Sequence, residues 1–444
     1  MRIAMIGTGY VGLVSGACFA EFGLDVVCVD KDADKVARLE RGEIPIYEPG
    51  LDELVAKTRA AGRLRFSTRM EEAVAGADAV FIAVGTPTRR GDGHADLSYV
   101  FQAAAEIADK LDGPAVVVTK STVPVGTTRR LGAFFRERRP DLAVEVASNP
   151  EFLREGSAIA DFMRPDRVIC GVESARAREV LELAYRPLNL IETPMLFTGL
   201  ETAELIKYAT NSFLAMKITF INELADLCEK VGADVQQVAK GIGLDGRIGR
   251  KFLHAGPGYG GSCFPKDTLA LLRTAEQYET PLRLVETVVQ VNEARKRRMV
   301  RRIVEALGGS VEGKNVAVLG VTFKPNTDDV RESPSLVIIP ALQAEGARVR
   351  AYDPKGMTEA ARLLPGVEWG RDSYQVARDA DALVLLTEWN EFRGLDLARL
   401  RRLMRRPVLI DLRNVYDPER VARAGFAYVS VGRPAIPALA GEPA

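Results

Sequence analysis

Histidine is scarce in this chain of 444 residues: only His94 and His254 occur. Metal sites and acid–base chemistry often use histidine, so reactions that need several histidines are nearly excluded. The five cysteines include no C-x-x-C pair. An odd number of cysteines without that spacing predicts neither a disulfide framework nor a common zinc site. We therefore expect no bound metal.

An excess of charge is also missing. The chain has 60 Lys+Arg, 60 Asp+Glu and a formal net charge of zero, which argues against a general binder of nucleic-acid phosphates. No apolar run approaches the roughly 18 residues of a membrane span. The N-terminal segment does not resemble a secretory signal. We expect a cytoplasmic protein that binds neither nucleic acid nor membrane.

Two series of short apolar segments, separated by helical patterns, dominate what is present. They predict strands at 2–6, 25–30, 79–84, 115–119, 143–147 and, further along, at 315–320, 347–353, 381–387 and 407–411. Apolar runs of this length without alternation are typical of buried parallel strands. We expect an α/β protein with two doubly wound, Rossmann-like domains.

The middle of the chain has helical spacing instead. Apolar residues recur at helical intervals through 199–232, and a second helical stretch covers 281–307. Its basic segment, 295–302, predicts a solvated helix face rather than a nucleic-acid site, because the chain is neutral overall. We expect Rossmann-like domains over 1–198 and 311–444, joined over 199–310 by a helical connector with a long helix and apolar faces that suit a dimer interface.

Gly7, Gly9 and Gly12 fit the pattern G-x-G-x-x-G between a predicted strand and a predicted helix, and Asp30 ends the next strand. This context predicts a dinucleotide site rather than a packing turn, because glycines let a pyrophosphate approach the backbone at a helix N-terminus. Asp30 can bind ribose hydroxyls and would repel a 2′-phosphate. It favours NAD over NADP, although the nearby Lys35 softens that argument.

Two threonines follow later strands of the same sheet. Thr86 and Thr122 lie beyond predicted strand ends, where ligands bind in open α/β sheets. We expect both to meet cofactor or substrate. A capping or turn role is the alternative for each hydroxyl, and it is favoured for Thr86 taken alone.

Cys263 follows a glycine-rich loop that begins at Gly256. Pro265 suits the first turn of a helix beginning here. A thiol at a helix N-terminus near Lys266 would have a lowered pKa, and Asp267 could face the same site. We therefore expect Cys263 to be a nucleophile. We expect the other cysteines, Cys18, Cys28, Cys170 and Cys228, to lie in the core. Cys170 ends a strand-like run.

Two further pairs have a spacing of four residues. Glu151 and Glu155 follow another predicted strand and could share a helix face, which suits acid–base work or sugar binding as well as plain solvation. Lys207 and Asn211 lie on the long central helix, where the lysine alternatively snorkels to solvent.

These motifs, in this order, resemble the UDP-glucose/GDP-mannose dehydrogenase family over nearly the whole chain. The matching segments are 7–12, 121–127, 149–156, 207–211, 247–252, 260–267 and 323–334. The resemblance implies a metal-free, four-electron oxidation of the C6 alcohol of a nucleotide sugar to a carboxylate, with two NAD reduced. It also implies a homodimer or higher oligomer, because an arginine at the position of Arg247 can come from the neighbouring subunit.

The resemblance implies that Cys263 traps an aldehyde as a thiohemiacetal and becomes a thioester, which water hydrolyses. Lys207 and Asn211 would stabilise the oxyanion. It also implies that Asp267 and Thr122 position or activate water and that Glu155 assists hydrolysis. Glu151 would hold the active-site network.

The resemblance also implies the binding residues, with NAD bound by the first domain and the UDP-sugar by the last. The implied NAD contacts are Gly7, Gly9, Tyr10, Val11, Gly12, Asp30, Lys35, Thr86, Thr122, Glu155, Lys266 and Arg331. The implied sugar-nucleotide contacts are Glu151, Phe152, Leu153, Arg154, Glu155, Lys207, Asn211, Arg247, Phe252, Leu253, His254, Ala255, Gly256, Gly260, Phe323, Lys324 and Arg413.

Residues beside Cys263 resemble the UDP-glucose branch, which implies oxidation of UDP-glucose to UDP-glucuronate. The GDP-mannose branch typically has leucine in place of Phe264, and dehydrogenases of N-acetylated hexosamines typically have histidine in place of Ser262. GDP-mannose or UDP-N-acetylmannosamine is the alternative substrate. A non-enzymatic sensor is the alternative function, but a sensor would be expected to lose Cys263, Lys207 or Asp267.

Overall fold

A computed structural model describes residues 1–89 and 93–436. The chain divides into two compact units. The first unit is Met1–Thr210 with Leu269–Thr280, and the second is Asn211–Thr268 with Pro281–Ala444. Residues 437–444, the end of the predicted domain over 311–444, lie outside the described part.

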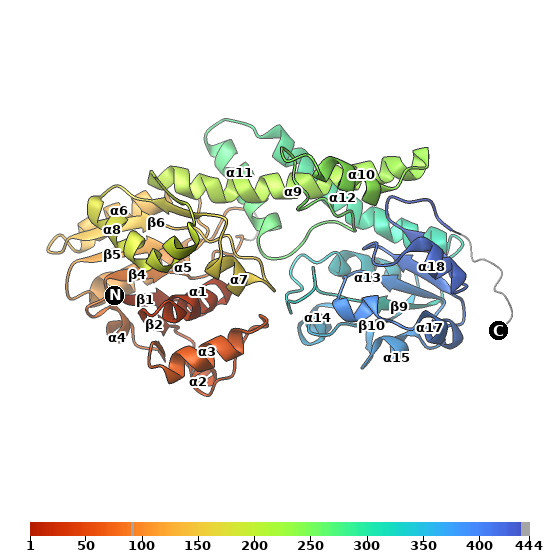
Figure 1. Ribbon diagram of the computed structural model, residues 1–444, viewed down its shortest axis with the longest axis horizontal. Helices are drawn as coiled ribbons and strands as arrows, with labels where there is room; N and C mark the ends of the chain where they lie inside the picture. The colour runs from red at the N-terminus through yellow and green to blue at the C-terminus, as the bar shows by residue number, and fades with distance from the viewer. Residues whose placement is uncertain (90–92, 437–444) are drawn as a thin grey trace. The chain divides into compact units, whose positions relative to one another are not determined.

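An eight-stranded sheet forms the first unit, in the order β3-β2-β1-β4-β5-β6-β7-β8. Figure 1 labels β1, β2, β4, β5 and β6 of this sheet. Neighbouring strands are parallel except for β6 with β7. The order reverses between β1 and β4, as in Rossmann folds. The strands are β1 (Arg2–Ile6), β2 (Asp25–Val29), β3 (Leu64–Ser67), β4 (Ala79–Ile82), β5 (Ala115–Thr119), β6 (Val144–Ser148), β7 (Val168–Gly171) and β8 (Met195–Thr198).

Helices cover both faces of this sheet. Because successive strand residues point to opposite faces, Ile3 and Met5 of β1 lie in one apolar core, and Ala4 and Ile6 lie in the other. The helices are α1 (Tyr10–Glu21), α2 (Ala33–Glu40), α3 (Leu51–Ala60), α4 (Met70–Val74), α5 (Ser98–Lys110), α6 (Thr127–Arg138), α7 (Ala158–Met163), α8 (Ala175–Ala184) and the 3₁₀ helix η1 (Arg186–Ile191).

The second unit has a parallel six-stranded sheet in the order β11-β10-β9-β12-β13-β14, which repeats the order of the first six strands of the chain. Its strands are β9 (Asn315–Leu319), β10 (Arg348–Tyr352), β11 (Glu368–Trp369), β12 (Ala382–Leu385), β13 (Val408–Asp411) and β14 (Ala427–Ser430). Its helices are α10 (Val235–Gly243), α12 (Arg283–Ala306), α13 (Ser335–Ala344), α14 (Met357–Leu363), α15 (Ser373–Ala377), α16 (Asn390–Arg393), α17 (Leu397–Leu403) and α18 (Pro418–Arg423).

Two helices contribute residues to both units: α9 (Leu200–Val231), the longest of the labelled helices in Figure 1, and α11 (Phe264–Gln277). The predicted fold class is therefore confirmed: two Rossmann-like doubly wound α/β domains with a central helical region. Among the helices of the described residues, none has the length and apolarity that crossing a membrane requires.

The predicted strands agree with the structure to within two residues at each end. Four strands that the apolar pattern did not reveal all lie at sheet edges: β3, β8, β11 and β14. An edge strand is less fully covered than a central one, so its sequence lacks the continuous apolar run on which the prediction relied.

Helix α12 corrects the prediction for the basic segment 295–302. Arg295 and Lys296 are buried in the second unit, with only 2% and 1% of their side chains exposed. The Arg295 guanidinium lies 2.9 Å from the carboxylate of Asp226, which also binds Arg298. Part of this segment therefore packs inward, because acidic side chains and backbone carbonyls neutralise its charge.

Candidate functional site

A pocket of about 270 Å³ lies in the first unit where the strand order reverses. Its lining includes Gly7 and Gly9 from the turn after β1, Asp30 after β2, and Gly85 after β4. This is the position at which open α/β sheets bind nucleotides. The predicted dinucleotide motif therefore lines a real cavity.

The three motif glycines serve different purposes. Gly7 has φ +103°, a left-handed conformation that favours glycine. A Cβ at Gly12 would lie 1.9 Å from the carbonyl oxygen of Gly7, so α1 can pack against the turn only without a side chain there. A Cβ at Gly9 would meet no protein atom within 4 Å. The space beside Gly9 at the N-terminus of α1 thus fits a pyrophosphate.

Asp30 is held as an ionised acceptor beside this turn. Its carboxylate accepts hydrogen bonds from the Thr8 amide at 3.0 Å and from the Thr8 hydroxyl at 2.6 Å, and it pairs with Lys35 at 2.9 Å. Burial raises the pKa of Asp30, but these bonds outweigh burial and lower it to about 2. Lys35 is engaged by Asp30 itself, so the pair suits ribose hydroxyls better than a 2′-phosphate.

Hydrogen bonds tie together the loops after β4, β5 and β6. The Thr86 hydroxyl donates to the backbone oxygen of Thr122 at 2.8 Å, a bond between two loops rather than a local capping or turn bond. The buried Lys120 ammonium donates to the Asn149 side chain at 2.8 Å and to the Tyr185 hydroxyl at 2.9 Å. These contacts fix Thr122 and the start of the loop after β6 at one edge of the sheet.

Lys207 and Glu151 form a buried ion pair in the first unit. The ammonium lies 3.0 Å from the Glu151 carboxylate and donates to the Glu151 backbone oxygen at 2.6 Å. The two side chains are 3% and 6% exposed, so Lys207 does not snorkel. The idea that Glu151 and Glu155 share a helix face is wrong: residues 151–154 form a loop, and a turn follows at 155–156. The Glu151 carboxylate accepts the Leu153 amide, a local bond that competes with helix formation.

The other predicted residues of this loop have assorted contacts. The Arg167 guanidinium carbon lies 3.9 Å from the centre of the Phe152 ring. The Arg154 guanidinium pairs with the Asp161 carboxylate at 2.6 Å. Leu153 packs against the apolar core, and Glu155 is half-buried. The loop therefore offers aromatic, aliphatic and charged groups beyond β6.

In the second unit, Asp267 joins two predicted residues. Its carboxylate, in a side chain 1% exposed, lies 2.6 Å from the Asn211 amide nitrogen and 2.6 Å from the Lys266 ammonium. Cys263 directly precedes α11, and its backbone oxygen accepts the Asp267 amide at 2.8 Å. The Cys263 sulfur is half-buried, 3.5 Å from the Ser262 hydroxyl. The four other cysteines are buried, which confirms their predicted core positions.

Three buried polar residues that the sequence analysis missed hold the loop before Cys263. Arg295 donates to the Gly256 oxygen at 2.6 Å, and the Asn222 side chain accepts the Gly256 amide at 2.8 Å. Asn292 binds both the amide and the oxygen of Tyr259. The signal was available as polar residues on the inward faces of helices, but sequence spacing does not say which loop such residues bind.

Two glycines let this loop touch the segment after β9. A Cβ at Gly260 would lie 2.2 Å from the Glu332 oxygen, and one at Gly261 would lie 2.7 Å from the Phe323 ring. The Gly261 amide also donates to the Arg331 oxygen at 2.9 Å. The run of glycines is thus required by close backbone approach within the second unit.

Basic side chains gather where the strand order of the second sheet reverses. Arg413, after β13, donates to the Phe323 oxygen at 3.0 Å and to the Leu386 oxygen at 2.7 Å, which joins the loops after β9 and β12. The Lys324 ammonium lies 5.3 Å from the centre of the Phe323 ring. This edge of the sheet can therefore receive an anionic ligand.

The remaining predicted residues range from highly exposed to buried. Arg247 is 90% exposed and pairs with Asp245, and Arg331 is 63% exposed and pairs with Asp329. Phe252 has a left-handed φ of 64° and packs near Phe264. The side chains of Leu253 and Ala255 lie in the apolar core, so these residues offer a ligand only their backbone groups, whereas His254 is exposed.

A dinucleotide pocket in one Rossmann-like sheet, a second such sheet and a half-buried cysteine directly before a helix fit the class of dinucleotide-dependent oxidoreductases. Sequence models of the UDP-glucose/GDP-mannose dehydrogenase family match residues 1–189 (NAD binding domain), 201–294 (central domain) and 317–418 (UDP binding domain). The chain belongs to this family, and its first domain binds NAD.

Relatives of this chain cover nearly its full length. It is 63% identical to the UDP-glucose 6-dehydrogenase of Rhizobium meliloti (strain 1021), over 98% of this chain and 100% of that protein. A solved UDP-glucose dehydrogenase from Pyrobaculum islandicum is 42% identical and superposes with a TM-score of 0.87, over 93% of this chain and 94% of that chain. A UDP-D-ManNAc dehydrogenase from Pyrococcus horikoshii is 29% identical with a TM-score of 0.86, over 98% and 99%.

The motif glycines allow a matched pair of substitutions. We expect Gly12→Ala to lower the melting temperature by at least about 5 °C, because its Cβ would overlap the Gly7 oxygen. Gly9→Ala should keep the melting temperature but weaken NAD⁺ binding at least about tenfold, because its Cβ would occupy ligand space. Thermal scans and calorimetric titration check both. Unaltered NAD⁺ binding by Gly9→Ala would contradict the placement of the pyrophosphate.

Lys120 predicts a pH dependence of stability. Burial lowers the pKa of Lys120 from 10.5 to about 8. Between these values the unfolded chain keeps a proton that the folded protein has released, so stability rises with pH. We compare the free energy of unfolding of the wild type with that of Lys120→Met. The wild type should gain about 2 kcal/mol relative to the variant between about pH 7 and about pH 9.5. Denaturant titrations measure this difference, and a constant value would show that Lys120 is not buried as an amine.

Proposed function

We propose that this protein oxidises UDP-glucose to UDP-glucuronate and reduces two NAD⁺ for each sugar. The observation that carries the proposal is the position of Cys263, at the end of a glycine-rich loop and one turn before the buried Asp267. This cluster supplies a nucleophile and charged partners without a histidine. Family membership and 63% identity to a UDP-glucose 6-dehydrogenase support the same reaction.

Binding would use both sheets at the edges where their strand order reverses. The turn after β1 and the carboxylate of Asp30 would hold NAD⁺ in the first unit. Lys324, Arg413 and the backbone of the loop from Gly256 would hold the diphosphate and the sugar nucleotide in the second unit. We propose the boundaries 1–198, 199–310 and 311–444 for the NAD-binding, connecting and UDP-sugar-binding domains.

The first oxidation converts the C6 alcohol to an aldehyde. Bound NAD⁺ supplies the hydride acceptor. The hydroxyl proton leaves to solvent, and Lys207 and Asn211, four residues apart on α9, would stabilise the negative charge on oxygen. The ion pair with Glu151 would offset the cost of burying the Lys207 ammonium.

The second oxidation would take place on Cys263. Its thiolate attacks the aldehyde carbon to form a thiohemiacetal, which loses a second hydride and becomes a thioester. A water molecule, positioned by Asp267 and Thr122 and assisted by Glu155, adds to the thioester and releases the carboxylate and the thiol. Overall, one alcohol, one water and two NAD⁺ give one carboxylate, two NADH and three protons.

Three finer features belong to the same proposal. Arg247 is highly exposed in one chain, which is consistent with a contribution to the site of a neighbouring subunit in a homodimer. The predicted cytoplasmic location stays a prediction. The second candidate is oxidation of a related nucleotide sugar, GDP-mannose or UDP-N-acetylmannosamine. The similarity to the UDP-D-ManNAc dehydrogenase supports it.

The yield of NADH per sugar tests the reaction. With limiting UDP-glucose, about two NADH per sugar are expected from the atom balance of a four-electron oxidation. A parallel series with GDP-mannose and UDP-N-acetylmannosamine should give much lower values of kcat/KM. One NADH per UDP-glucose would exclude the thioester route, and a higher kcat/KM with another sugar would reassign the substrate.

Replacing the nucleophile separates chemistry from binding. Cys263→Ser should reduce complete turnover to below about one-thousandth of the wild-type rate, because a hydroxyl does not form the thioester. NAD⁺ affinity should stay at the wild-type value. The matched control Cys228→Ala, a core position, should keep the turnover rate of the wild type. Full turnover by Cys263→Ser would rule out covalent catalysis by this residue.

A further inference from the structure

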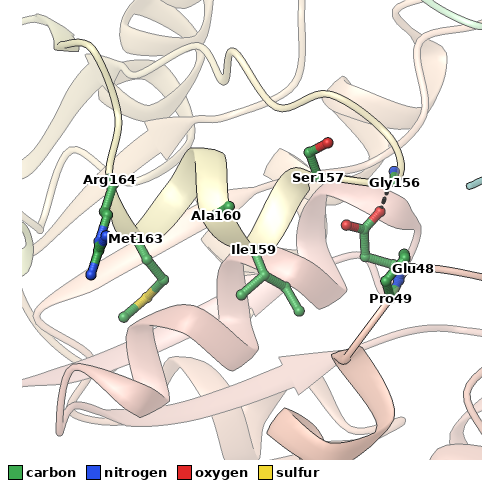
Figure 2. A pocket seen from close by; sticks show the side chains of 8 residues that line it. All are labelled: Glu48, Pro49, Gly156, Ser157, Ile159, Ala160, Met163 and Arg164. Carbon is green, nitrogen blue, oxygen red and sulfur yellow. Dashed lines mark hydrogen bonds between the residues drawn. The ribbon is translucent and has the colours of Figure 1, made fainter.

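The segment between α2 and α3 carries a buried carboxylate, Glu48, to which no role has been given. Its side chain is 5% exposed. One oxygen accepts the Ala158 amide at 2.7 Å, and the other accepts the Gly156 amide at 2.6 Å together with the hydroxyl of Tyr10. Figure 2 shows the Glu48 carboxylate directed at the Gly156 nitrogen, at one end of a pocket of about 530 Å³.

The three groups bound by Glu48 belong to two functional segments of the first unit. Tyr10 is the first residue of α1 and lies inside the motif Gly7–Gly12, where the pyrophosphate of NAD is expected. Gly156 and Ala158 follow Glu155 at the end of the loop after β6. Glu48 is therefore a direct bridge between the turn that holds the cofactor and the loop that carries the carboxylates of the reaction.

The chemistry of this bridge makes it sensitive to both of its ends. The three donors are neutral, and their hydrogen bonds offset the cost of burying the Glu48 side chain, so losing any one of them is costly. Burial, the hydrogen bond to Glu48 and the charges of Glu48 and Glu155 raise the pKa of Tyr10 well above its usual value. The Tyr10 hydroxyl thus stays protonated and remains a donor. Movement of Tyr10 would alter the bonds that Glu48 makes to Gly156 and Ala158.

We propose that Glu48 is a positioning residue that couples NAD binding to the ordering of the loop Glu151–Gly156. When NAD⁺ orders the turn at the N-terminus of α1, Tyr10 holds Glu48, and Glu48 holds the Gly156 and Ala158 amides. The loop that carries Glu151 and Glu155 is then ordered before the sugar arrives. The catalytic roles of Glu151 and Glu155 in this loop rest on the proposed function, but the coupling itself needs only NAD⁺.

Hydrogen exchange with NAD⁺ alone tests the coupling. In the wild type, saturating NAD⁺ should slow exchange of the Gly156 and Ala158 amides by about tenfold. Tyr10→Phe removes only the hydroxyl that donates to Glu48. Measured at NAD⁺ concentrations that saturate this variant, it should abolish the slowing. Glu48→Gln should also abolish it, and adding Tyr10→Phe to Glu48→Gln should cause no further change, because both act through one bridge.

Tyr278→Phe is the matched control, since Tyr278 also belongs to the first unit but is 70% exposed and lies outside the lining of the dinucleotide pocket. It should keep the wild-type slowing. Slowing that survives in Tyr10→Phe, or its absence from the wild type with NAD⁺ bound, would overturn the proposal. If Glu48→Gln does not fold, Tyr10→Phe alone still decides. A positive exchange result with no oxidation of UDP-glucose would refute the proposed function and leave the coupling standing.

Discussion

The Lys207 ammonium lies 3.0 Å from the Glu151 carboxylate, and both side chains are almost fully buried. Charges buried this deeply are stable only when they are paired and hydrogen-bonded. The same condition holds for Asp267 with Lys266 and Asn211, and for Asp30 with Lys35 and the Thr8 amide. In the proposed reaction, lysines, carboxylates and one thiol do the work that histidines often do, and these ion pairs offset the cost of burying the charged side chains.

Helix α9 shows how the fold satisfies that condition. Glu204 binds the Gly126 and Thr128 amides at the start of α6, and this fixes the loop that follows Thr122. One turn later Lys207 binds Glu151, and one turn further Asn211 binds Asp267. A single helix therefore presents three polar residues at intervals of three and four along its sequence. The predicted roles of Lys207 and Asn211 depend on this spacing.

Much of this arrangement could be predicted from the sequence, for physical reasons. Central strands are covered on both faces, so their apolar runs revealed both Rossmann sheets, and Gly7, Gly9 and Gly12 identified the dinucleotide turn. Edge strands and buried polar anchors such as Arg295 and Glu48 were missed, because their partners are distant in sequence. Local spacing also misplaced Glu151 on a helix, where a hydrogen bond to Leu153 decides otherwise. Periodicity reports burial, but it does not identify polar partners.

The central claim is that the second half of a four-electron oxidation takes place on one cysteine, Cys263, through a thioester. Glu155→Gln should slow hydrolysis of the thioester, so that acid-quenched protein incubated with UDP-glucose and NAD⁺ gains the mass of one UDP-glucuronyl group. Peptide mapping should place that group on Cys263, hydroxylamine should release it, and Cys263→Ser should not acquire it. Steady turnover without any adduct on Cys263, or an adduct on another residue, would contradict the account.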